Sequence, residues 1–148
     1  MRMSRNNYRM IYSALLIAAF FIPAYGHVSA FGFLRLALGS IRTDTEVTYI
    51  DLLVILLPLI FIPISAVIIL VRAAKQKPFN GLLLSLPLLF LAFFSLILSF
   101  DMNRQVNSTN VIGLIKDMSV GFYLASLASI LLIFSYSKRE SLNFGSKR

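Results

Sequence analysis

Asp51 is the residue of this chain whose type and position best suit chemistry. It stands at the start of an apolar run, Ile50–Val71, in which Ser65 is the only other polar residue. A carboxylate inside a membrane is typical of a proton or cation site, but such groups usually lie deep and face a cavity. Thr48, three residues earlier, has the spacing of a capping box, and a negative charge in a first helical turn meets the positive end of the helix dipole. We therefore predict that Asp51 caps a helix, with a weak ion site as the alternative.

Two prolines, Pro58 and Pro63, interrupt the same run. Each removes one backbone hydrogen bond and bends a helix. Transporters place broken helices around substrate sites, but polar side chains accompany them there. This run offers only Ser65, whose hydroxyl we expect to satisfy a carbonyl that a proline leaves free. We interpret the prolines as a structural kink.

The residue types that are absent from the 148-residue chain exclude several kinds of catalytic and metal site. There is no cysteine, and His27 is the only histidine. Thiolate catalysis and cysteine-based metal centres are thereby excluded, and a transition-metal site usually takes several His or Cys ligands. No nucleophile is paired with a base, and no glycine-rich phosphate loop is present. We expect a protein that is not an enzyme and has no catalytic residue, metal site or cofactor.

Hydrophobic residues make up 58% of the chain, against about 45–50% in ordinary soluble domains. The mean hydropathy is +0.82. Crossing a bilayer takes about 20 mostly apolar residues. The four most apolar runs cover residues 10–25, 50–71, 82–100 and 118–136. They predict an all-α membrane protein, a four-transmembrane-helix bundle that forms a single polytopic domain over residues 1–148.

The first of these runs has a second interpretation. Basic residues precede it, and the small residues Ala24 and Gly26 stand near its end. Those features are typical of a secretory signal that is cleaved from the mature protein. The run is long for such a signal, so we expect it to remain as the first span.

The basic residues are divided unequally between the two sides of this arrangement. Ten of the 14 Lys and Arg residues lie before the first run, between the second and third, or after the fourth, whereas five of the six acidic residues lie on the other side. An excess of Lys and Arg in short loops marks the cytoplasmic side. We expect both termini to be cytoplasmic, in a plasma membrane and specifically the bacterial inner membrane. The net charge of +8 then reflects orientation and attraction to anionic membrane lipids, not nucleic-acid binding.

The first outer loop, residues 26–47, has a helical pattern of its own. Phe31, Leu34, Leu38 and Ile41 recur at helical spacing, with Arg35 on the opposite side. The pattern predicts a short amphipathic interfacial helix on the outer membrane surface. Such a helix either shields the ends of the spans or docks another protein.

Small residues recur at four-residue spacing in the last run, at Gly121, Ala125 and Ser129. Because membrane helices associate through close packing and hydrogen bonds, such a stripe marks a helix contact. We expect the contact to lie within the bundle, with another subunit as the alternative.

Together these patterns favour a small, non-catalytic accessory or structural subunit of a larger membrane protein assembly. The expected partners are membrane lipids and other membrane protein subunits. The alternative is a small transporter, channel or holin-like pore that acts as a homo-oligomer, with serines of the last two runs lining its pathway.

Overall fold

The computed structural model describes residues 4–40, 49–105 and 118–136. These residues form five helices and one two-stranded antiparallel sheet. The helices are α1 (Arg5–Ala19), α2 (Ala30–Ser40), α3 (Tyr49–Ala74), α4 (Gly81–Gln105) and α6 (Val120–Phe134), and the strands are β1 (Pro23–Tyr25) and β2 (Val28–Ser29). The predicted all-α class is therefore confirmed, with a short hairpin added between α1 and α2.

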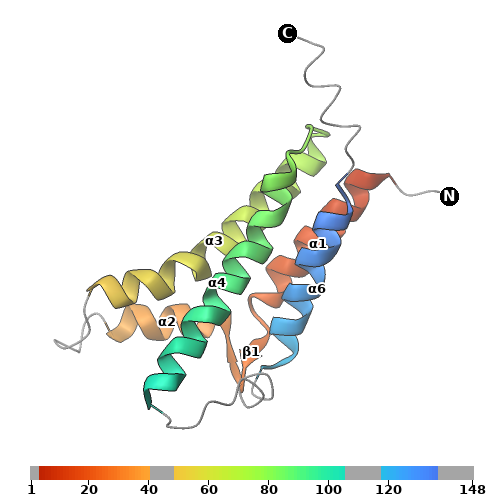
Figure 1. Cartoon of the computed structure of the whole chain (residues 1–148). Helices are drawn as coiled ribbons and strands as arrows, with labels where there is room; N and C mark the ends of the chain where they lie inside the picture. The colour runs from red at the N-terminus through yellow and green to blue at the C-terminus, as the bar shows by residue number, and fades with distance from the viewer. Residues whose placement is uncertain (1–3, 41–48, 106–117, 137–148) are drawn as a thin grey trace.

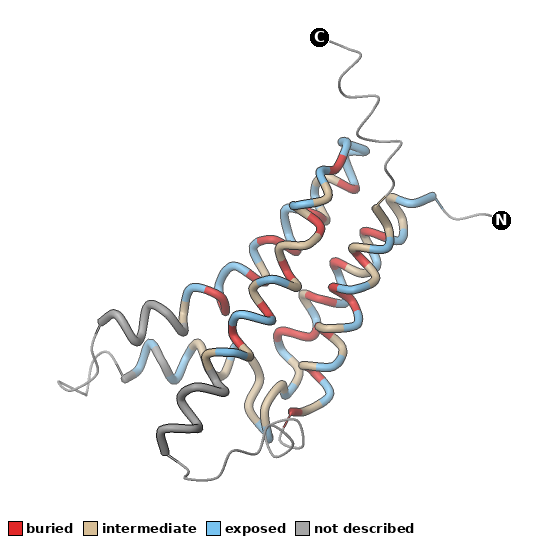
Figure 2. Tube along the Cα trace, viewed as in Figure 1, coloured by how far each residue is buried: buried red, intermediate tan, exposed pale blue. Residues whose placement is uncertain are grey.

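Four of the helices pack in a ring. α1 contacts α3 and α6, and α4 contacts the same two helices from the other side. Each helix contributes a fully buried side chain to the shared core, and these include Leu16, Ile69, Leu84 and Leu132. The connection between α3 and α4 lies at the end of the bundle where the chain enters α1 and leaves α6, while the hairpin lies at the opposite end (Figure 1). Buried residues recur at intervals along the described parts of all four helices (Figure 2).

α1 differs at both ends from the expected segment, residues 10–25. It begins at Arg5 because Ser4 caps it, with the Ser4 hydroxyl accepting a hydrogen bond from the Asn7 N–H at 3.3 Å. It ends at Ala19, so Pro23 lies in β1 and not in the last helical turn. Gly26, with a φ of +54°, supplies the left-handed residue in the turn of the hairpin. The apolar run Phe20–Tyr25 therefore belongs to the hairpin end of the bundle.

α3 continues as a helix through both Pro58 and Pro63. Figure 1 shows that it changes direction along its length, as expected where prolines remove helical hydrogen bonds. The Ser65 hydroxyl donates to the Ile62 carbonyl at 2.8 Å. Pro63 leaves the carbonyl of Leu59 without its usual donor, so the role predicted for Ser65 is wrong.

The turn from α3 into α4 is held by side chains on both sides. The Arg72 guanidinium donates to the Pro78 carbonyl at 2.8 Å, which ties the end of α3 to the connecting segment. Asn80 then caps α4, since its Oδ1 accepts a hydrogen bond from the Leu82 N–H at 3.4 Å. The two longest helices are thus joined by a short, structured connection.

At the other end of the bundle, the hairpin is tied to the start of α6. The backbone N–H of Ser119 donates to the Ala24 carbonyl at 2.9 Å, and the Ser119 hydroxyl donates to the Gly26 carbonyl. An isolated β-bridge joins Tyr25 to Met118 beside these bonds. The carbonyls of Ala24 and Gly26 in the hairpin are therefore satisfied by Ser119, the residue that precedes α6.

Candidate functional site

The predicted outer helix corresponds to α2, and its side chains are arranged differently from the expected two-faced pattern. Phe33, which was not among the predicted contact residues, packs edge-on against Tyr25 and against Phe94 of α4. Phe31 contacts the rings of Phe20 and Phe21 at the end of α1. Aromatic contacts of this kind anchor α2 to the bundle.

The side of α2 that faces away from the bundle mixes apolar and basic residues. Leu36 is 64% exposed, and Leu38 and Arg35 are exposed beside it, whereas Leu34 is half-buried. Ile41, the last of the predicted contact residues, lies outside the described part of the chain. Leu36 and Leu38 are two residues apart and therefore lie on different sides of α2, so the structure leaves two separate exposed leucines near a cation. Its role as a partner contact stays a prediction.

The small-residue stripe of α6 lies inside the bundle. Gly121, Ala125 and Ser129 are all buried, and the Ser129 hydroxyl donates to the Ala125 carbonyl of its own helix at 2.7 Å. A Cβ atom on Gly121 would come within 2.6 Å of the Ile22 carbonyl oxygen and 2.7 Å of that of Pro23. Gly121 therefore permits a close approach of α6 to the backbone that follows α1.

Asp51 is the third residue of α3, the helical position that a capping box assigns to its acidic member. The placement of the Asp51 side chain lies outside what the structure describes. Among the described residues, no three His, Cys, Asp or Glu side chains come together as a metal site would require.

Arg9, one of the basic residues that precede the first apolar run, is buried in the structure and forms a site of its own. It is 1% exposed, and its Nη2 donates to the Ser135 carbonyl at 2.8 Å while its Nε donates to the Ser135 hydroxyl at 3.2 Å. Nη1 donates to Asn6, and the guanidinium lies 4.4 Å from the centre of the Phe79 ring. Spacings of four and three residues place Arg9, Ser13 and Leu16 on one helical face, a signal that the sequence carries for the burial of Arg9.

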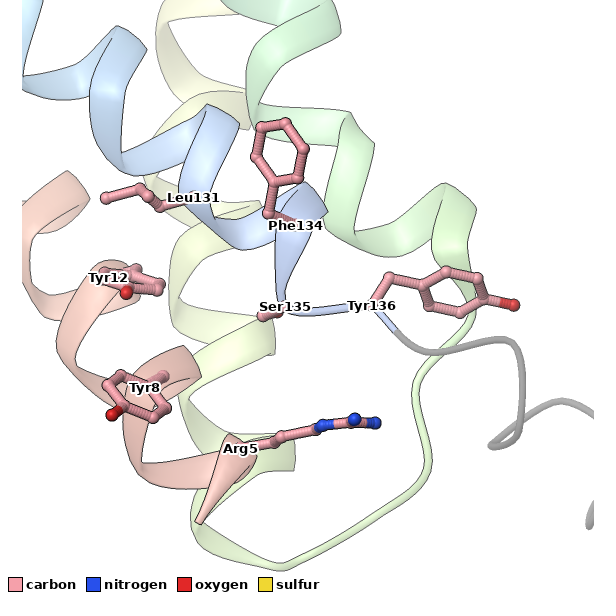
Figure 3. Close-up of a pocket in the computed structure, with 7 residues that line it drawn as sticks. All are labelled: Arg5, Tyr8, Tyr12, Leu131, Phe134, Ser135 and Tyr136. Carbon is pink, nitrogen blue, oxygen red and sulfur yellow. The ribbon is translucent and has the colours of Figure 1, made fainter. Parts of the chain in front are cut away.

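Beside Arg9, an open groove of about 320 Å³ separates α1 from the end of α6. It is lined by Arg5, Tyr8 and Tyr12 from α1, by Leu131 and Phe134 from α6, and by Ser135 and Tyr136. Figure 3 shows the two tyrosines of α1 on one side of the groove and Phe134 and Tyr136 on the other. The groove brings a cation, phenolic hydroxyls and apolar rings together, and the sequence does not predict it because its residues are distant in the chain.

A smaller, partly open space of about 30 Å³ lies between the helices. Its lining is almost entirely apolar and includes Leu16, Leu59, Leu91 and Phe122. A space of that size has room for a water, but its lining offers too few polar partners to hold one in an ordered position. The described interior of one chain therefore contains no aqueous pathway at this point.

The length and composition of the helices bear on where the chain resides. In the described part of the chain, one helical segment, Leu56–Ala74 of α3, is long and apolar enough to cross a membrane, with a mean hydropathy of 2.4 over 19 residues. The apolar helical segments Gly81–Ile97 and Val120–Phe134 are shorter. No protein-family model, curated protein or solved structure matches this chain.

Proposed function

We propose that this chain is a small, non-catalytic integral membrane protein that serves as an accessory or structural subunit of a larger membrane assembly. In this proposal α1, α3, α4 and α6 all span the bilayer, and both termini lie in the cytoplasm. The observation that carries the membrane location is the character of the exposed surface.

Large apolar side chains are exposed on every helix of the ring. Examples are Leu15 on α1, Ile64 on α3, Leu89 on α4 and Leu127 on α6. Buried positions, by contrast, include the polar residues Arg9, Ser13, Ser65 and Ser129. Soluble monomers rarely expose continuous apolar surface on this scale, whereas lipid tails solvate it.

The shortness of α1 and α6 is compatible with a bilayer because of the hairpin. Fifteen helical residues each rise about 22 Å, less than the roughly 30 Å of hydrocarbon. Non-helical backbone at membrane depth is tolerated where protein groups satisfy its hydrogen bonds. The bonds from Ser119 to Ala24 and Gly26 have that effect at the end where α1 stops and α6 begins.

The arrangement of the serines favours a subunit over a pore. The hydroxyls of Ser85, Ser95, Ser126 and Ser129 each donate to a carbonyl of their own helix, three or four residues earlier. Because each hydroxyl proton is used in such a bond, these serines can only accept hydrogen bonds from a transported solute and cannot donate to it. The pore alternative therefore needs a pathway between several copies of the chain.

Within the accessory-subunit proposal, the outward side of α2 is the partner contact. Leu36 and Leu38 are exposed next to Arg35, the mixture of apolar contact and flanking charge that interfaces use. The double variant Leu36→Ala, Leu38→Ala tests this assignment, with Leu89→Ala, Leu127→Ala as a matched control at two exposed leucines of the spans.

The experiment is purification of the three proteins in mild detergent with identification and quantification of co-eluting chains. We expect the wild type and the control variant to retain the same large partners in fixed stoichiometry, and the α2 variant to remain monodisperse but lose them. A wild type that elutes as a pure homo-oligomer and conducts solutes in liposomes would establish the pore alternative instead.

A further inference from the structure

The groove between α1 and the end of α6 has a concentration of positive charge. Arg5 is exposed at its edge, and none of its seven lining residues is acidic. The Arg9 guanidinium lies directly behind the wall formed by Ser135, to which it donates two hydrogen bonds. Arg5 is the cation that lines the groove, whereas buried Arg9 adds positive charge from behind Ser135. Phosphate oxygens are the acceptors that match guanidinium donors in geometry and charge.

The same groove is rich in tyrosine. Tyr8 and Tyr12, four residues apart on α1, have ring centroids 6.2 Å apart, and Tyr136 packs against Gly81 at the start of α4. Tyrosines with an apolar ring and a polar hydroxyl are enriched at the level of lipid headgroups. Their position beside Arg5 places headgroup-compatible groups around the cation.

Away from Arg5, the walls of the groove continue as apolar surface. Phe134 is 80% exposed. Leu15 lies seven residues after Tyr8 and three after Tyr12, and Leu127 lies four residues before Leu131, so both continue the same helical faces. Leu15 and Leu127 are exposed. A free phosphate would make no use of this surface, whereas an acyl chain would cover it.

We propose that the groove binds one anionic glycerophospholipid, with Arg5 holding its phosphate and an acyl chain lying against Leu15 and Leu127. This inference rests on the proposed membrane location. It assigns to the cytoplasmic end of the bundle a site for a single lipid, beyond the general attraction of a basic surface for anionic membranes.

The test uses the full chain reconstituted in nanodiscs of phosphatidylcholine with a minor fraction of phosphatidylglycerol. Native mass spectrometry then counts the lipids that stay bound after release. We expect one phosphatidylglycerol on the wild type, and a loss of about five- to tenfold in its retention relative to phosphatidylcholine for Arg5→Gln. Lys75→Gln is the matched control, because Lys75 is an exposed cation outside the groove, in the connection between α3 and α4 that lies at the same end of the bundle (Figure 1). We expect that variant to retain the lipid like the wild type.

The outcomes separate this inference from the proposed function. A chain that does not incorporate into nanodiscs would overturn the membrane location and the site together. Incorporation with equal retention of both lipids, or equal losses for Arg5→Gln and Lys75→Gln, would overturn the site alone. Displacement of the lipid by excess inorganic phosphate would also overturn it, since the groove would then recognise phosphate without the acyl chain.

Discussion

Arg9 and Ser135 join the first turns of α1 to the end of α6, although 126 residues separate them in the sequence. The Arg9 guanidinium donates to the Ser135 carbonyl at 2.8 Å and to the Ser135 hydroxyl at 3.2 Å. Ser135 is the C-cap of α6, so a positive charge meets the negative end of that helix dipole. The face of Phe79, just before α4, covers the same guanidinium. One buried side chain thus links α1, α6 and the connection before α4.

We expect Arg9→Ala to lower the free energy of unfolding by about 3 kcal/mol or more, because it removes two hydrogen bonds from a charged group and leaves the Ser135 carbonyl without that donor. Arg9→Lys keeps the charge but cannot form both of the hydrogen bonds to Ser135 in the same geometry, so we expect an intermediate loss of about 1–2 kcal/mol in the free energy of unfolding. Unfolding of the detergent-solubilised protein with increasing SDS measures both. Arg5→Ala serves as the control, since Arg5 is exposed in the same helix. Equal stability of Arg9→Ala and Arg5→Ala would contradict the linking role.

The close approach at Gly121 predicts a penalty for a single methyl group. A Cβ atom there would lie within 2.7 Å of two backbone carbonyl oxygens, which cannot rotate away as a flexible side chain can. We expect Gly121→Ala to cost about 1–3 kcal/mol, the range of other overpacking changes. Gly39→Ala is the matched control, because a Cβ on Gly39 of α2 would meet nothing within 4 Å.

In the control, alanine's higher helix propensity favours stability by up to about 1 kcal/mol. Thermal unfolding of the two variants should therefore shift the transition in opposite directions. A Gly121→Ala protein that melts at or above the wild-type temperature would show that the backbone after α1 has room to move.

The parts of the fold that the sequence predicts well are those set by long apolar runs. The cores of α3 and α4 follow from such runs, and Pro78 and Asn80 between them mark the break. The ends of α1 did not follow in the same way. Its polar first turns resemble an unstructured tail unless Ser4 is recognised as a helix cap. The residues after Ala19 are apolar, and a short apolar run alone does not show whether the chain continues as a helix or turns into a hairpin.

The groove could not be predicted because it depends on the tertiary packing of α1 against the end of α6. Tyr8 and Tyr12 show a local i, i+4 pair, but nothing in their spacing identifies Tyr136 as a neighbour. The packing of α2 shows the same limit. The exposed and buried sides of so short a helix depend on where Phe94 lies, and that position is set by α4.

Asp51 offers a test between a helix cap and an ion site. α3 begins at Tyr49, which places Asp51 in its first turn, where a carboxylate stabilises the helix by its charge. We expect Asp51→Asn to cost at most about 1 kcal/mol and to leave partner retention unchanged. Thermal unfolding and co-purification measure these effects. If the variant stayed folded but lost a proton- or cation-coupled flux that the wild type shows in liposomes, the ion-site alternative would replace the cap.

The last prediction concerns orientation, and it follows from the position of the basic residues on the bundle. The start of α1 and the connection between α3 and α4 lie at the same end of the bundle (Figure 1), and these segments carry Arg5, Arg72, Lys75 and Lys77. The hairpin, whose turn contains exposed His27, lies at the opposite end. Because Lys and Arg in short loops are retained on the cytoplasmic side, we expect that first end to be cytoplasmic.

Cysteine labelling can test this cleanly because the natural chain contains no cysteine. In intact cells a membrane-impermeant maleimide should label His27→Cys and spare Lys77→Cys, and permeabilisation should make both reactive. Both substitutions replace exposed side chains, so neither is expected to disturb the core. Labelling of Lys77→Cys in intact cells with His27→Cys protected would invert the topology. Labelling of both positions only after permeabilisation would mean that the bundle does not cross the membrane from end to end.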